Sequence, residues 1–248
     1  MLTPALIGAA SLAGRRWGPA LSGWLVGLPF TSAPITLFLA LDHGAPFARA
    51  AAIGTLAGTM SQTAFCLAYG ALAPRFAWPV ALGASVVAFG AVTAVLQRVS
   101  VPLPALLAAV TIVLVVALVL MPHRSDAAPS RELPAWDIPA RMLLATVFVL
   151  ALTALAPALG AGLTGLLAPF PLYAAVLATF AHRLQGAGPA RGVVRGLLLG
   201  LFAFAGFFVT LAALIADAGV TLAFAGATVV ALAIQGVSFV VLQRGAAS

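Results

Sequence analysis

The sequence contains no lysine and only five acidic residues, and charged residues make up 7% of its 248 positions. Soluble domains carry roughly a quarter charged residues, so this composition excludes an ordinary soluble protein. A single cysteine, Cys66, excludes an internal disulfide and a cysteine metal cluster, and we expect it to be a small buried apolar residue. Hydrophobic residues make up 63% of the chain, which indicates a polytopic membrane protein.

Charged and catalytic groups are also missing from the middle of every apolar segment. Proton and sodium pumps commonly bury carboxylates in their spanning helices, and no such relay is visible here. The apolar segments contain no Ser-His-Asp set, no metal-ligand spacing and no phosphate-binding loop. The sequence therefore predicts neither an enzyme nor a site for a cofactor or metal.

The net charge of +7 comes from arginines scattered singly between apolar runs. Such scattering argues against nucleic-acid binding and favours contacts with anionic lipid headgroups on the cytoplasmic side. The first apolar stretch has no positive leader and precedes Arg15 and Arg16, so we expect no cleavable signal peptide.

Nine apolar segments predict an all-α bundle of about nine transmembrane helices. Their approximate ranges are 1–18, 17–41, 47–73, 77–97, 101–121, 138–157, 161–183, 191–215 and 219–243. The one clearly polar loop, 122–137, follows the fifth segment.

Alternating these segments across a membrane separates the arginines into two unequal groups. One side collects Arg15, Arg16, Arg75, Arg124, Arg131, Arg141, Arg183, Arg191, Arg195 and Arg244, and the other collects Arg49 and Arg98. Because arginine accumulates in cytoplasmic loops, we expect a bacterial inner-membrane protein with its N-terminus outside and its C-terminus in the cytoplasm.

The two halves of the chain share a spaced pattern of residues. Residues matching without a gap at an offset of 142 are Gly44, Ala45, Ala48, Arg49, Gly54 and Gly58 with Gly186, Ala187, Ala190, Arg191, Gly196 and Gly200. Flanking matches pair 19–21 with 157–159 and 95–98 with 241–244. The sequence therefore predicts that the first four segments repeat as the last four.

An odd number of segments per repeat step makes equivalent helices antiparallel, which predicts an inverted-topology repeat. The expected units are a first repeat at 1–97, a linking helix at 101–121, a polar loop at 122–137 and a second repeat at 138–244.

Prolines interrupt the second and seventh segments at related places. Pro29 and Pro34 lie near the centre of one segment, and Pro169 and Pro171 lie in the other. Proline removes a backbone donor, and an unpaired carbonyl in hydrocarbon costs several kcal/mol unless protein, water or ligand satisfies it. The breaks are either kinks repaired by Thr31 and Ser32 or parts of a shared site near the midplane.

Polar residues also line one face of the third segment at helical spacing, namely Thr55, Thr59, Gln62, Cys66 and Tyr69. These residues either bond between helices or line a cavity, and the same alternatives apply to Gln235 in the ninth segment. His43 and His182 follow the two broken helices at membrane edges, where each is either solvated or part of a gate.

Residues 163–182 (LTGLLAPFPLYAAVLATFAH) resemble the GlpM-like small bacterial inner-membrane proteins, through Gly165, Leu166, Phe170, Pro171 and His182. The resemblance implies an inner-membrane unit, here fused in two inverted copies, and no particular substrate. The predicted arrangement of four helices, one linking helix and four inverted helices is similar to that of two-domain fluoride channels, but their signature motifs are not present.

The sequence favours a small-molecule transporter that works by alternating access, with a neutral, amphipathic or anionic substrate. One alternative is an ion channel with a static pore at the paired breaks, and another is a non-transporting scaffold or assembly factor for envelope polysaccharide synthesis. A homo-oligomer is left open. The candidate substrate-binding residues are Pro29, Phe30, Thr31, Ser32, Pro34, Thr59, Gln62, Pro169, Phe170, Pro171, Tyr173 and Gln235, with His43 and His182 as candidate gates.

Overall fold

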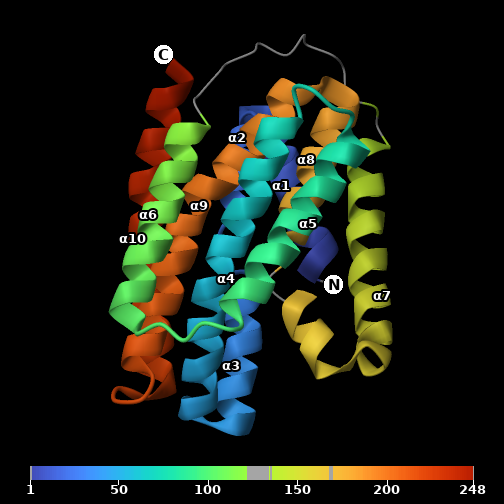
Figure 1. Cartoon of the computed structure of the whole chain (residues 1–248). Helices are drawn as coiled ribbons and strands as arrows, with labels where there is room; N and C mark the ends of the chain where they lie inside the picture. The colour runs from blue at the N-terminus through green and yellow to red at the C-terminus, as the bar shows by residue number, and fades with distance from the viewer. Residues whose placement is uncertain (1, 122–133, 135, 168–169, 248) are drawn as a thin grey trace.

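Long α-helices make up the structure, a computed structural model that describes residues 2–121, 134, 136–167 and 170–247. Within these ranges every regular element is an α-helix. The helices are α1 (Leu2–Trp17), α2 (Pro19–Val26), α3 (Ser32–His43), α4 (Ala45–Leu72), α5 (Trp78–Leu96), α6 (Leu103–Leu120), α7 (Asp137–Leu167), α8 (Leu172–Gln185), α9 (Ala187–Leu214) and α10 (Gly219–Ala247). Figure 1 shows most of them lying along the long axis of an elongated bundle.

Four helices are long and apolar enough to cross a membrane: α5, α6, α9 and residues 219–240 of α10. In α9, 72% of the most apolar window is buried inside the protein, whereas in each of the other three the buried share is 22%. The helix α9 therefore lies at the centre, and the other three turn apolar side chains outward, as lipid requires. The chain is a membrane-embedded helical protein.

The structure divides two parts of the chain differently from the nine predicted segments. The predicted segment 17–41 consists of two helices, α2 and α3, separated by residues 27–31. The predicted boundary between 138–157 and 161–183 is wrong, because α7 continues past it to Leu167. A single proline at position 157 removes only one backbone hydrogen bond, and a membrane helix tolerates that loss.

Helices α4 and α9 match in length and in position within their halves. Each has 28 residues, and both pairs of bounds differ by 142 (187 minus 45, and 214 minus 72). Each follows a glycine of similar backbone conformation, with φ 85° and ψ 172° at Gly44 and φ 100° and ψ −173° at Gly186. A side chain would be strained at both glycines. In Figure 1, α4 rises through the bundle while α9 descends, so the two helices run in opposite directions.

Helix α2 crosses α9 with backbone against backbone. A Cβ atom added at Gly196 would collide with the Ala20 carbonyl. One added at Gly200 would lie 2.6 Å from the Trp24 carbonyl oxygen and 2.8 Å from the Gly27 Cα. Small residues allow membrane helices to approach this closely, so the spaced glycines of α9 set the position of α2 and of the break that follows it.

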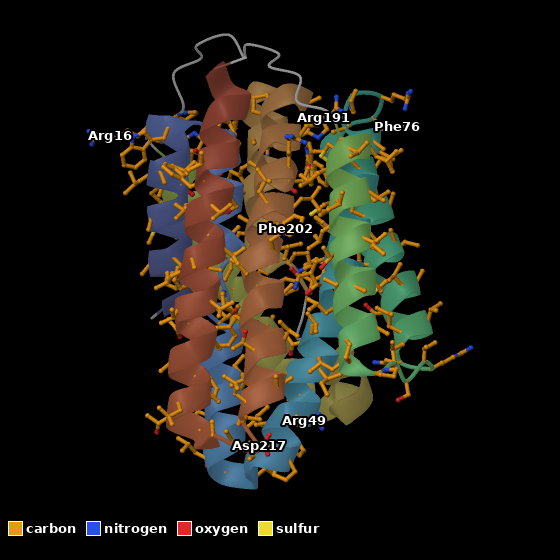
Figure 2. All side chains as sticks on the ribbon, turned by 90° about the vertical axis from the view of Figure 1, so that its left-hand side faces the viewer. Arg16, Arg49, Phe76, Arg191, Phe202 and Asp217 are labelled. Carbon is orange, nitrogen blue, oxygen red and sulfur yellow. The ribbon has the colours of Figure 1, made fainter. Side chains whose placement is uncertain are left out.

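Charged residues mark the two ends of the bundle. Figure 2 shows Arg16 and Arg191 near one end, and Arg49 and Asp217 near the other. Phe202 lies between them, within the central helix α9. The apolar length of the bundle therefore separates an end that holds Arg16 and Arg191 from an end that holds Arg49.

Candidate functional site

The first helix break is a tight turn centred on Pro29. The backbone N–H of Phe30 donates to the Leu28 carbonyl at 2.8 Å, which closes a three-residue turn around the proline. The N–H of Ala33 then donates to the Pro29 carbonyl at 2.9 Å and starts α3. Pro34 lies in the first turn of α3, where proline is tolerated, and the helical bonds of Ala33 and Ile35 continue on either side of it, so Pro29 and not Pro34 interrupts the helix.

The second break has the same construction around Pro171. The N–H of Leu172 donates to the Phe170 carbonyl at 2.8 Å, and that of Ala175 donates to the Pro171 carbonyl at 2.9 Å. Pro171, with φ −78° and ψ 59°, has the geometry of an inverse γ-turn. Pro29 and Pro171 are also 142 residues apart, the offset that relates α4 to α9. Pro169, the other proline expected to break this segment, lies outside the described residues.

A polar network from α10 surrounds the end of α2 at the first break. The side-chain nitrogen of Gln235 donates to the Trp24 carbonyl at 3.0 Å, and the Trp24 indole N–H donates to the Ser238 hydroxyl at 2.8 Å. The Ser238 hydroxyl in turn donates to the Gln235 carbonyl at 2.9 Å. Gln235 is 4% exposed, and its side-chain oxygen has no hydrogen-bond partner. The amide therefore pairs a carbonyl in the last turn of α2 and leaves one buried acceptor unused.

Aromatic rings surround the second break instead. Phe170 meets Phe65 of α4 and Phe89 of α5 edge-on, with ring centroids 5.8 and 5.4 Å apart. It stacks on Phe148 of α7 at 6.1 Å. Such aromatic pairs stabilise packing beyond the area that they bury. The two breaks thus share their backbone geometry but differ in chemistry, since one is polar and the other aromatic.

The polar face predicted on the third segment lies in α4, where Thr55 is half-buried and the other four residues are buried. Thr59 is fully buried and its hydroxyl has no hydrogen-bond partner, while Gln62 is 6% exposed. Thr55 bonds within its own helix, to the Ala51 carbonyl at 2.8 Å. A buried hydroxyl without a partner is uncommon in proteins and is accounted for by water, a ligand or strain.

The two candidate gate histidines occupy different environments. His43 is the last residue of α3, is exposed and stacks on Phe47 at a centroid distance of 4.8 Å. His182 lies one turn before the end of α8, with its Nδ1 3.4 Å from the hydroxyl oxygen of the buried Tyr69. At the offset of 142, His43 corresponds to Gln185 and not to His182, so the two histidines are not equivalent by the repeat.

Other predicted site residues lie outside the groups of side chains that surround the two breaks. Phe30 is 41% exposed, so it is not enclosed as Phe170 is. Thr31 and Ser32 are half-buried, and Thr31 makes no side-chain capping bond. Tyr173 packs on a small cluster between α1, α7 and α8. The structure therefore gathers Phe170 with the aromatic cluster and Gln235 with the first break, and leaves Phe30 and Tyr173 outside both groups.

A buried ionic cluster was missed by the sequence interpretation, which placed Asp137 at the end of a polar loop. Asp137 is fully buried at the start of α7 and accepts hydrogen bonds from Arg141 at 2.7 Å and Arg15 at 3.3 Å. The Arg141 guanidinium also lies over the Phe180 ring at 5.2 Å. The spacing of Asp137 and Arg141, four residues apart in one helix, was the available signal.

Comparison of the chain with protein-family models, with curated proteins and with solved structures found no match. The resemblance to the GlpM-like proteins therefore stays a prediction. The fold and the two breaks define this chain as a membrane-embedded helical protein with two matched helix breaks. Its function is therefore inferred from the geometry of those breaks.

Proposed function

We propose that the protein is a small-molecule membrane transporter that works by alternating access between two inverted repeats. The observation that carries this proposal is the pair of proline-centred breaks at Pro29 and Pro171. Broken helices at related places of inverted repeats are a known pointer to a substrate site near the bilayer midplane. A single kink would need no such explanation, but two turns of the same construction at one offset favour a shared role.

The arrangement of helices supports the repeat. The central pair α4 and α9 is in contact, and the linking helix α6 packs against both. Each central helix also contacts the helix before it and the helix after it, α3 and α5 for α4, and α8 and α10 for α9. Two four-helix units related by a two-fold axis in the membrane plane would share these contacts, whereas the close contact of α2 with α9 has no comparable counterpart between α7 and α4 in the described part of the chain.

Buried polar and aromatic groups on α4, on α10 and at the second break favour a substrate class. Thr59 and Gln235 each offer a buried oxygen with no hydrogen-bond partner, and Phe170 adds an aromatic surface. The charged residues that Figure 2 labels lie near the ends of the bundle. Since burying an unpaired charge is costly, this environment favours a neutral or amphipathic substrate with hydrogen-bonding groups, or an anion at the N-terminus of α3 or α8.

The distribution of arginines supports an orientation in the bacterial inner membrane. Arg16 and Arg191 lie near the end that we assign to the cytoplasm, and Arg49 lies near the opposite end. With the positive-inside rule, this distribution favours a cytoplasmic C-terminus, and we infer an outside N-terminus from the alternation of the predicted segments.

Flux measurements on purified protein in liposomes test the transporter. The probes are a radiolabelled aliphatic alcohol, a monosaccharide, a monocarboxylate and inorganic phosphate, each followed against empty liposomes. A transporter gives saturable uptake of at least one probe, whereas a channel passes ions orders of magnitude faster with little saturation.

A double substitution, Pro29→Ala with Pro171→Ala, tests the site itself. Restoring a backbone N–H at both turns favours continuous helices over the broken ones. We expect uptake to fall by at least about tenfold, which corresponds to raising the free energy of the broken-helix conformation by roughly 1.4 kcal/mol. The matched control is Pro79→Ala in the first turn of α5, where proline replaces no helical bond. Unchanged uptake in the folded double variant would remove the breaks from the mechanism.

A further inference from the structure

One arginine joins the two central helices at one end of the bundle. The Nε of Arg49, in the first turns of α4, donates to the Ala212 carbonyl of α9 at 3.0 Å. Ala212 lies in the last turn of α9, where carbonyls have no partner within the helix. A cation at a helix C-terminus also interacts favourably with the helix dipole. The contact therefore joins the start of α4 to the end of α9.

The repeat contains a second copy of these two groups at the opposite end. At the offset of 142, Arg49 corresponds to Arg191 near the start of α9, and Ala212 corresponds to Gly70 near the end of α4. Figure 2 shows Arg49 and Arg191 at opposite ends of the bundle. The Gly70 carbonyl lacks the helical donor four residues later, because that residue is Pro74, which has no N–H. The acceptor for Arg191 is thus present.

In this conformation another element stands beside Gly70. The Met121 side chain, at the end of α6, lies where a side chain at position 70 would begin. Arg195 of α9 holds this end of α6 by donating to the carbonyls of Leu118, at 3.2 Å, and Met121. In the described part of the chain, Arg191 makes no bond to Gly70. The two ends of the central pair therefore differ in the groups that join them: Arg49 bonds to α9 at one end, and Arg195 bonds to α6 at the other.

We propose that Arg49 and Arg191 are paired gate residues that close the two ends of the central helix pair in turn. The structure has the Arg49 end latched to Ala212. In the alternate conformation the end of α6 moves away from Gly70, Arg191 takes the Gly70 carbonyl, and the Arg49 bond breaks. This inference rests on the proposed function, because it takes the two repeats to exchange conformations. Both arginines act on access and neither contacts substrate.

Two buried alanines provide matched reporters beside the arginines. Ala48 and Ala190 correspond at the offset of 142, and both are fully buried. In a background where the one cysteine is removed (Cys66→Ala), each is changed singly to cysteine. The full chain is placed in lipid nanodiscs, which expose both ends, and the rate of labelling by a water-soluble maleimide is measured by mass spectrometry.

The expected result is a crossed pattern. Arg49→Gln speeds labelling of Ala48→Cys and slows that of Ala190→Cys, each by about two- to fivefold, the effect of losing one modest hydrogen bond. Arg191→Gln produces the opposite pair of changes. Arg98→Gln, an exposed arginine outside both contacts, leaves the two rates as they were.

Equal changes at both ends, or no change at either end, would overturn the gate assignment. Because each arginine is tested at both reporters, a variant that merely loosens the fold is recognised by faster labelling at both. The proposed function is judged separately by flux of the unmodified protein. Flux of a probe without the crossed labelling pattern would reject the gate assignment and leave the transporter proposal in place. A crossed labelling pattern without flux of any probe would reject the transporter proposal and leave the gate assignment in place.

Discussion

The substitution Gly200→Ala tests the contact on which the position of the first break depends. The added Cβ would lie 2.6 Å from the Trp24 carbonyl oxygen and 2.8 Å from the Gly27 Cα, whereas ordinary contact begins at 3.4 Å. Both neighbours are backbone atoms, so no side chain can rotate away. The helices α2 and α9 would have to separate by about 0.6 to 0.8 Å at the crossing to restore ordinary contact.

The energy of this separation follows from two opposing effects. Overpacking a close contact lowers the free energy of unfolding by about 1–3 kcal/mol. Because the neighbouring atoms here belong to rigid backbone, we expect a loss of about 3 kcal/mol. Replacing a helical glycine by alanine contributes about 1 kcal/mol in the opposite direction. The net destabilisation is about 2 kcal/mol, which for a chain of this size lowers the melting temperature by about 4–8 °C.

Thermal unfolding in mild detergent, followed by tryptophan fluorescence, measures this shift. The matched control is Gly90→Ala in α5, where an added Cβ meets no atom within 4 Å. That variant keeps the helix-propensity gain without the clash, so its melting temperature should rise or stay level. If Gly200→Ala behaves like Gly90→Ala, the two backbones do not touch and the reasoning about the break is refuted.

Two further substitutions test the buried polar groups. Gln235→Leu removes the donor to the Trp24 carbonyl and should lower stability by about 1 kcal/mol, measured by the same thermal unfolding, while Gln97→Leu at the exposed end of α5 should have no effect. Asp137→Asn leaves Arg141 buried without an anionic partner and should destabilise by about 3 kcal/mol, while the exposed Asp217→Asn should change stability little. Equal melting temperatures of either variant and its control would contradict the contact in question.

Much of the candidate site could be predicted because its main features are local. Proline at positions 29 and 171 lacks an N–H whatever surrounds it, so the sequence could propose both breaks, although the same donor is missing at Pro157, which α7 accommodates without a break. The expectation that Pro34 also breaks the helix was wrong, because Pro34 lies in the first turn of α3, where proline is tolerated and the helix continues on both sides of it. Deciding between these cases requires knowing where the helix starts, and helix boundaries depend on tertiary contacts.

The partners of the buried polar residues could not be predicted in this way. Gln235 was recognised as a buried amide in need of a partner, but the carbonyl that it meets is 211 residues away in the chain. Likewise, nothing near Phe170 in the sequence pointed to the rings of Phe65 and Phe89. Such pairings depend on which helix faces cross, and periodicity alone does not specify that.

The sequence by itself determined that this is a membrane-embedded helical protein, that helices break at Pro29 and Pro171, and that α4 and α9 are related by a constant offset. Hydropathy, missing backbone donors and residue spacing act over a few positions, so they can be read along the chain. Only the tertiary structure decided that one break is capped by Gln235 and the other is enclosed by aromatic rings, and that Asp137 is buried between two arginines. These differences arise because the surroundings of each break come from distant helices, and packing brings different side chains to two turns of the same backbone geometry.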